Sequence, residues 1–102
     1  MVIYGNEIDF KISRLKDAGN FELALQNMEK SEKEISKSNG RITEVIAQGI
    51  GMFRKFFKDA TGVDVLEKCE DFNEAKEAYV CFLNEVKKQK DSVLQFTVDD
   101  IK

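Results

Sequence analysis

The chain has 102 residues, of which 42% are apolar and 34% are charged, so it is long enough for one domain with one modest core. Its formal net charge of -3 excludes a basic footprint over the whole chain of the kind that binds nucleic acid. It contains no histidine, which excludes serine–histidine and cysteine–histidine catalysis and histidine metal sites.

Membrane and secretory segments are not expected. No apolar run approaches the roughly 20 residues that cross a bilayer, and MVIYGNEIDF at the start lacks the regions of a signal peptide. We therefore expect a soluble cytoplasmic protein with no membrane association. In that compartment Cys69 and Cys81 are expected to be reduced, structural thiols rather than a disulfide.

Residues 2–12, VIYGNEIDFKI, predict a β-hairpin. The apolar residues of its second half alternate with polar ones, which is the period of a half-buried strand: Ile8, Phe10 and Ile12. Gly5 and Asn6 readily adopt the positive φ angles of a tight turn. Because two strands alone are marginally stable in water, the hairpin is expected to pack on a helix.

Residues 18–38 predict a first helix, with Asp17 or Asn20 as the cap at its start. A narrow apolar stripe follows one face at 3.6 residues per turn: Phe21, Ala24, Leu25, Met28 and Ile35. The helix is therefore expected to be peripheral and largely solvated, and to end at residues 38–40. The alternative is that Gly40 is a flexible point within one longer helix.

Residues 41–60 predict the central helix. At about 100° per residue its apolar residues fill an arc of roughly 160°, wide enough to contact two neighbours: Ile42, Val45, Ile46, Gly49, Ile50, Met52, Phe53, Phe56, Phe57 and Ala60. Gly49, near the middle of this arc, permits close approach, whereas Gly51 lies on the opposite, charged face. Gly62 is the expected C-terminal stop.

Residues 71–95 predict the third helix, after a short helical turn capped by Asp64. Cys81 is expected on its polar side, and eight residues on its buried face: Phe72, Ala75, Tyr79, Phe82, Leu83, Val86, Val93 and Leu94. No internal repeat or linker marks a second domain, so residues 1–102 are expected to form one. The fold class is mostly α, an N-terminal β-hairpin followed by a three-helix bundle.

Two groups of charged residues suggest chemistry, and each has a simpler explanation. Arg54, Lys55 and Lys58 resemble a membrane-surface or nucleic-acid element, but a solvated face is favoured because the rest of the chain is acidic. Four carboxylates lack the spacing of a calcium loop and resemble helix-capping acids: Glu67, Glu70, Asp71 and Glu74. No phosphate-binding loop is present. No catalytic, cofactor-binding or metal residue is assigned, and no small-molecule substrate is expected.

The central helix carries the candidate partner-binding residues: Met52, Phe53, Phe56 and Phe57. Phe56 and Phe57 are the foremost of these, although core packing accounts for at least one of the pair without a partner. On this hypothesis, Phe56→Asp or Phe57→Asp weakens the capture of a partner more than it lowers stability.

Three stretches resemble a family of small proteins from tailed phages and prophages of Gram-positive bacteria. The first stretch, VIYGNEIDFKIS…DAGNFELALQNMEK, is similar to their opening hairpin, I-x-x-G-x-E-x-x-F, and the Glu/Lys-rich helix that follows it. MFRKFFKDATG resembles their middle signature, and EAKEAYVCFLNEVKKQK their closing helix, with its E-A-Y-x-x-F-x-x-x-V pattern and nearby glutamine. The matched positions are Gly5, Glu7, Phe10, Phe56, Phe57, Asp59, Gly62, Glu77, Ala78, Tyr79, Phe82 and Val86.

The chain departs from that pattern after the middle signature. Thr61 replaces the aromatic residue before Gly62, and the next segment, VDVLEKCEDF, is shorter than the acidic, glycine-containing loop of the family. Those proteins look like the small helical tail-assembly chaperones encoded near the tape-measure protein of long-tailed phages.

The resemblance implies a non-enzymatic helper that coats an apolar helical protein until the tail tube polymerises around it. The resemblance implies that the partner is a protein component of the phage tail. The sequence does not decide whether the chain also forms a homo-oligomer. The alternative is a phage-encoded regulatory or adaptor module that binds a host protein.

Overall fold

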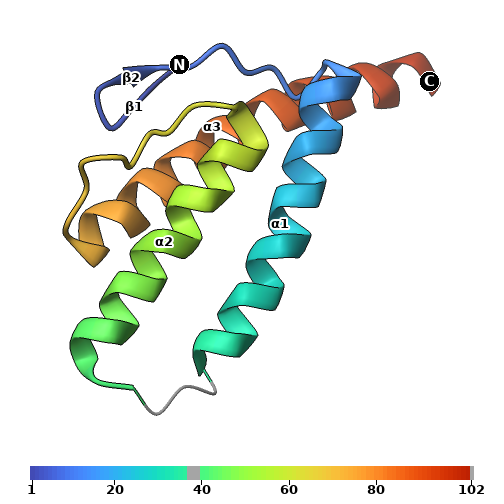
Figure 1. The fold of residues 1–102 in the computed structure, drawn as a ribbon. Coiled ribbons are helices and arrows are strands. Elements are labelled where there is room, and N and C mark those ends of the chain that lie inside the picture. Colours follow the sequence, from blue (N-terminus) through green and yellow to red (C-terminus); the bar gives the residue numbers. More distant parts are fainter. Residues whose placement is uncertain (37–39, 102) are drawn as a thin grey trace.

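A computed structural model describes the backbone of residues 1–36 and 40–101 and the side chains of 1–35 and 40–94. Two short strands, β1 (Val2–Ile3) and β2 (Asn6–Glu7), pair antiparallel. Three helices follow, α1 (Leu15–Ser36), α2 (Ile42–Thr61) and α3 (Phe72–Ile101) (Figure 1). The predicted fold class is confirmed: the protein is mostly helical, with an N-terminal hairpin and three packed helices.

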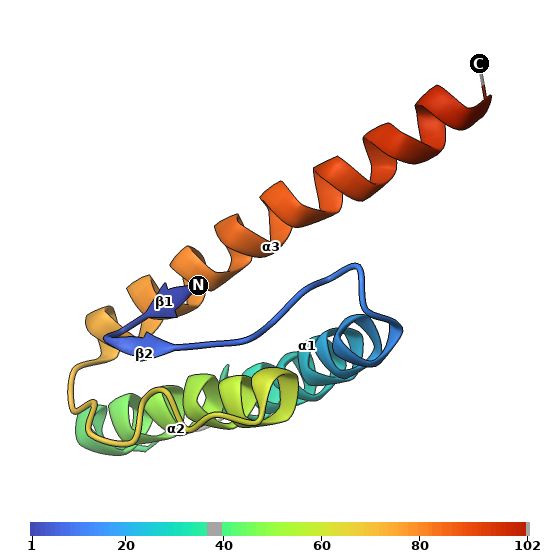
Figure 2. The ribbon, with the colours of Figure 1, turned by 90° about the horizontal axis from the view of Figure 1, so that it is seen from above.

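The helices form two layers with the N-terminal segment between them. α1 and α2 run side by side in opposite directions, and α3 crosses them obliquely (Figure 1). From above, the hairpin and the segment that follows it lie in the angle between α3 and the α1–α2 layer (Figure 2). Helices 1 and 2 are therefore separate and antiparallel, not one continuous rod. Gly40 precedes α2, and Ser38 and Asn39 of the predicted stop lie outside the described residues.

α1 begins three residues earlier than predicted, so neither predicted residue caps it. Asp17 lies within the first turn, where its Oδ2 accepts a hydrogen bond from the backbone N–H of Lys11 at 3.0 Å. This bond ties the incoming segment to the helix. The buried residues of α1 are few, Ala24 and Met28, which agrees with a peripheral helix.

α2 ends as predicted. Gly62 adopts the left-handed conformation (φ 75°, ψ 4°), and its N–H donates to the carbonyl oxygen of Lys58. The first turns of α2 differ from the prediction, because Ile42 is 73% exposed and Ile46 is 37% exposed. α3 begins at Phe72, and the Phe72 ring lies beside Gly49. The first turns of α2, before Gly49, therefore extend beyond the start of α3 and are not covered by it.

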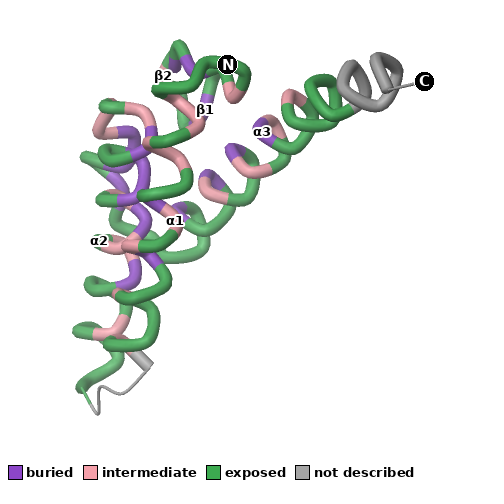
Figure 3. Tube along the Cα trace, turned by 90° about the vertical axis from the view of Figure 1, so that its right-hand side faces the viewer, coloured by how far each residue is buried: buried purple, intermediate pink, exposed green. Residues whose placement is uncertain are grey.

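An aromatic cluster forms the core where the layers meet. The ring of Phe82 on α3 has its centroid 5.1 Å from that of Phe10, in the N-terminal segment. It also contacts Phe21 of α1 and the adjacent Phe56 and Phe57 of α2, at 5.5 to 6.1 Å. Buried stretches accordingly line α2 and the first half of α3 (Figure 3). Every element except the two short strands contributes a ring to this cluster.

The buried face of α3 is shorter than predicted. Three residues expected on it are exposed: Phe72, Val93 and Leu94, at 36%, 43% and 51%. Tyr79 and Leu83 are half-buried, and the fully buried part ends at Val86. The physical reason is the oblique crossing, because only the first half of α3 lies over the α1–α2 layer and the rest runs away from it (Figure 2).

The hairpin is shorter than predicted and its turn is displaced by one residue. The positive φ angles belong to Tyr4 (50°) and Gly5 (76°), whereas Asn6 is already in β2. The alternation that predicted a long second strand is real: Ile8 and Phe10 are buried, and Asp9 and Lys11 are exposed. The backbone of Ile8 still exchanges hydrogen bonds with Met1, at 2.8 and 3.1 Å, but beyond Ile8 no strand of the described chain pairs with this segment, which lies between helices.

A glutamine side chain takes the place of the missing neighbouring strand. Gln89 of α3 accepts a hydrogen bond from the N–H of Ile12 at 2.8 Å and donates one to the carbonyl oxygen of Phe10 at 3.3 Å. Backbone polar groups that are removed from water need such partners. One side-chain amide thus holds an extended segment in the angle between the two helix layers.

Candidate partner-binding surface

Three of the four predicted partner-binding residues form the core. Phe53, Phe56 and Phe57 are 6%, 1% and 0% exposed. Phe56 contacts Phe57 edge to face, with the ring centroids 5.7 Å apart, and Tyr79 of α3 at 5.0 Å. None of these three rings offers a surface to a partner in this structure.

The apolar arc of α2 is wide because α2 contacts two helices. Phe56 reaches Phe21 of α1 with a centroid distance of 6.2 Å, and Phe53 reaches Phe72 and Tyr79 of α3 at 5.8 and 5.0 Å. Contacts with α1 and α3 therefore account for the burial of all the aromatic residues in the arc. Met52, the fourth candidate, is half-buried, and partner binding by Met52 stays a prediction.

A shallow groove follows the line where α1 and α2 meet, and Met52 lies in it. One hollow of about 290 Å³ is lined by Ser31, Glu34, Ile35, Gln48, Gly51, Met52 and Lys55; we call this the α1–α2 groove. A narrower depression continues it towards Asn27 and Asp59, with Ser31, Met52 and Lys55 common to both. Residues of both helices therefore line one extended surface.

The apolar residues that line the α1–α2 groove are Ile35 and Met52, and both are half-buried. Met28 lies next to this groove, buried in the narrow contact between α1 and α2. Methionine is flexible and polarisable, so it adjusts to apolar side chains of different shape. The Ser31 hydroxyl donates to the carbonyl oxygen of Asn27 at 3.2 Å and is thus already satisfied. A groove of this kind suits the apolar face of a helix.

The basic face of α2 is partly neutralised. Arg54 donates two hydrogen bonds to Asp64, from Nε at 2.8 Å and from an Nη at 2.6 Å. The Arg54 guanidinium lowers the pKa of Asp64 below its ordinary value of 3.8. Asp64, which was expected to cap a helical turn, therefore ties the loop after Gly62 back to α2. Lys55 and Lys58 stay exposed on the same helix.

The acidic residues before α3 have structural partners. The Oδ1 of Asp71 accepts a hydrogen bond from the N–H of Glu74 at 3.0 Å, which is the geometry of a helix N-cap. The Tyr4 hydroxyl donates to Glu74 at 3.2 Å, and hydrogen bonding to the Cys69 thiol, with loss of hydration and the nearby Glu74, raises the pKa of Tyr4 to about 12. Across the described residues, no three histidine, cysteine or acidic side chains are grouped so as to hold a metal ion.

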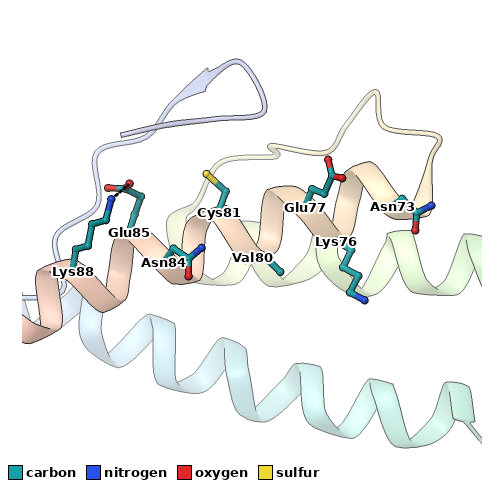
Figure 4. Close-up of a pocket in the computed structure, with 8 residues that line it drawn as sticks. All are labelled: Asn73, Lys76, Glu77, Val80, Cys81, Asn84, Glu85 and Lys88. Atoms are coloured by element: carbon teal, nitrogen blue, oxygen red, sulfur yellow. Dashed lines mark ion pairs between the residues drawn. The ribbon is translucent and has the colours of Figure 1, made fainter.

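Another hollow lies on the outer face of α3 (Figure 4). Its volume is about 710 Å³, and it is lined by Asn73, Lys76, Glu77, Val80, Cys81, Asn84, Glu85 and Lys88. All of these residues come from one helix, so no second element encloses the hollow. Cys81 is exposed there, as predicted, while Cys69 is buried, and both are free cysteines.

Two functional features were not found from the sequence. Gln89 holds the N-terminal segment. The sequence signal for this role is a polar residue that lies on the same face of the helix as the buried Phe82 and Val86. The Arg54–Asp64 ion pair joins residues on either side of Gly62, and only the fold of that loop reveals it.

None of the described helices has both the length and the hydropathy of a membrane-spanning segment. A scan against protein-family models, a comparison with curated proteins and a comparison with solved structures found no match.

Proposed function

We propose that this chain is a non-enzymatic protein that binds an apolar helical segment of another protein, and that it acts as a tail-assembly chaperone of a phage or prophage. The tape-measure protein is the proposed partner. The three stretches that resemble small phage proteins support the assignment to phage tail assembly. The α1–α2 groove, with Ile35 and Met52 as its apolar lining, is the observation that carries the binding function.

The groove supports binding through apolar contact. A partner helix that lies along α1 and α2 places side chains at every third or fourth position against Ile35 and Met52. Each Å² of apolar surface that leaves water contributes about 25 cal/mol, and the loss of freedom on association offsets much of this gain. Such an interaction is reversible, which a chaperone needs because the tail tube must replace it.

Co-purification tests the proposal. The chain, tagged and co-expressed with candidate phage tail proteins including the tape-measure protein, is expected to retain the tape-measure protein. Met52→Asp should abolish the capture because it places a charge in the apolar lining, whereas Met52→Leu should preserve it. Val80→Asp is the matched control, because Val80 is 43% exposed on the outer face of α3.

Circular dichroism of each variant shows whether it is folded. Capture that Met52→Asp leaves unchanged, or that Val80→Asp abolishes equally, would contradict binding at the α1–α2 groove. If the wild-type chain retains a host protein and no tail protein, the adaptor function replaces the chaperone function.

A further inference from the structure

The outer face of α2 carries a glycine that the folded chain does not require. Gly51 is exposed, and a Cβ atom built on it would meet no atom within 4 Å. A glycine inside a helix costs about 0.5–1 kcal/mol relative to alanine. Gly49, on the inner face, has a reason to be glycine because a Cβ there would lie 2.6 Å from the ring of Phe72. No contact within the chain explains Gly51.

Opposite charges lie at equal distances on either side of Gly51. Glu44 precedes it by seven residues and Lys58 follows it by seven, so each lies about 10 Å away along the helix axis. Seven residues are nearly two turns, so all three residues lie along one face. Glu44 and Lys58 are both exposed, and neither makes an ion pair with another described residue.

We propose that this face of α2 binds the same face of a second copy of the chain, with the two α2 helices antiparallel and crossing at Gly51. In a two-fold arrangement, a residue before Gly51 lies opposite the residue that follows Gly51 by the same number in the other copy. Glu44 of each copy therefore faces Lys58 of the other. The pattern of charge on α2 is complementary to itself.

The antiparallel arrangement is the one that the charges favour. Parallel helices crossing at Gly51 would place Glu44 beside Glu44 and Lys58 beside Lys58, which is repulsive. In the antiparallel pair, the long side chain of Lys55 lies opposite Ala47, so a small residue makes room for a large one.

The surface around Gly51 is also hollow. Gly51, Arg54, Lys55, Lys58 and Asp59 line an open depression of about 470 Å³ on this face of α2, with no second element of the described chain beside it. Gly51 and Lys55 also line the α1–α2 groove, but self-association needs no other protein, so its test is independent of the proposed function.

Sedimentation equilibrium of the full chain tests this inference. The wild-type mass is expected to rise with concentration from 11.7 kDa towards twice that value. Glu44→Lys and Lys58→Glu should each weaken the dimer by about tenfold or more, because each turns two attractive contacts into two repulsive ones. Glu77→Lys, the same charge change on the outer face of α3, should leave the mass unchanged.

Mixing the two variants gives the decisive result. In a heterodimer of Glu44→Lys with Lys58→Glu, both contacts between positions 44 and 58 again join opposite charges, so an equimolar mixture should recover the dimer. Gly51→Leu should prevent the dimer without lowering stability, because its side chain meets open space in the monomer. A wild-type chain that is monomeric up to roughly 1 mM, or a mixture that stays monomeric, would overturn the proposal.

Discussion

The inner and outer faces of α2 use glycine for different reasons. Gly49 and Gly51 are two residues apart in the same helix, and each carries the same intrinsic cost. On the inner face Gly49 makes room for the ring of Phe72, whereas space around Gly51 on the outer face is open. The position of the neighbouring elements therefore decides whether a contact within the chain requires a glycine in a helix: one does at Gly49, and none among the described residues does at Gly51.

The same division separates the core from the surfaces that we propose for binding. The inner face contributes Phe53, Phe56 and Phe57 to the core, where α1 and α3 cover them. The edge of α2 next to α1 presents Met52, and the outer face presents charges. The surfaces that we propose for other molecules thus lie where α2 has no neighbour, whereas Phe56 and Phe57 are buried in the core.

The largest expected effect comes from removing a ring of the inner face. Phe57→Ala should lower the free energy of unfolding by about 3–5 kcal/mol, because it leaves a cavity beside Phe56 and Phe82. Urea unfolding followed by circular dichroism measures the change. Phe72→Ala, which truncates a ring that is 36% exposed, should cost clearly less. Equal losses for the two variants would show that the inner face is not the core of the fold.

The width of the apolar arc on α2 correctly predicted a central helix with two neighbours, but it could not show which rings those neighbours cover. That depends on where α3 begins: Phe72 starts it opposite Gly49, which buries Phe53 and leaves Ile42 exposed. A residue's angular position on a helix is local information, and the start of another helix is not.

The N-terminal segment shows the same limit. The alternation from Ile8 to Ile12 correctly predicted which side chains are buried, because alternation reports an extended chain with one covered side. It could not distinguish a strand from a segment held by Gln89, which is 77 residues from Ile12 in sequence. Of the four predicted site residues, only Met52 lies at the candidate surface. The sequence could not separate it from the others, because the packing of α1 decides which apolar residues of α2 are covered.

Gly49→Ala is the next largest test of the two faces. Its methyl group must displace the Phe72 ring, and overpacking of this kind typically costs 1–3 kcal/mol, which the better helix propensity of alanine offsets by up to about 1 kcal/mol. We expect a net loss of roughly 1–2 kcal/mol in the free energy of unfolding. Adding Phe72→Ala should remove the penalty of the new methyl group. A penalty that persists in the double variant would mean that another contact requires Gly49.

Gly51→Ala should change stability in the opposite direction. Since the added methyl group meets no atom of the chain, only the helix propensity changes, and the free energy of unfolding should rise by about 0.5–1 kcal/mol. The measurement belongs at a low protein concentration, so that self-association does not contribute. Gly19→Ala, another open glycine in a helix, is the matched control and should give a similar gain. A lower free energy of unfolding for Gly51→Ala, without one for Gly19→Ala, would show that a contact within the folded monomer requires glycine at position 51.

The smallest expected effect lies at the boundary between the faces, where Arg54 pairs with Asp64. The guanidinium holds the pKa of Asp64 below 3.8, so the folded protein favours the ionised carboxylate. This contribution is present above the ordinary pKa and is lost as the pH falls through the lowered value. The urea midpoint should therefore fall less between pH 5 and pH 2 for Asp64→Asn than for the wild type. Salt should reduce this difference, because Arg54 and Asp64 are both partly exposed. Asp59→Asn, on the same helix but with no such ion pair among the described residues, should follow the wild type. If the urea midpoint of Asp64→Asn depended on pH as that of the wild type does, the Arg54–Asp64 ion pair would not stabilise the loop.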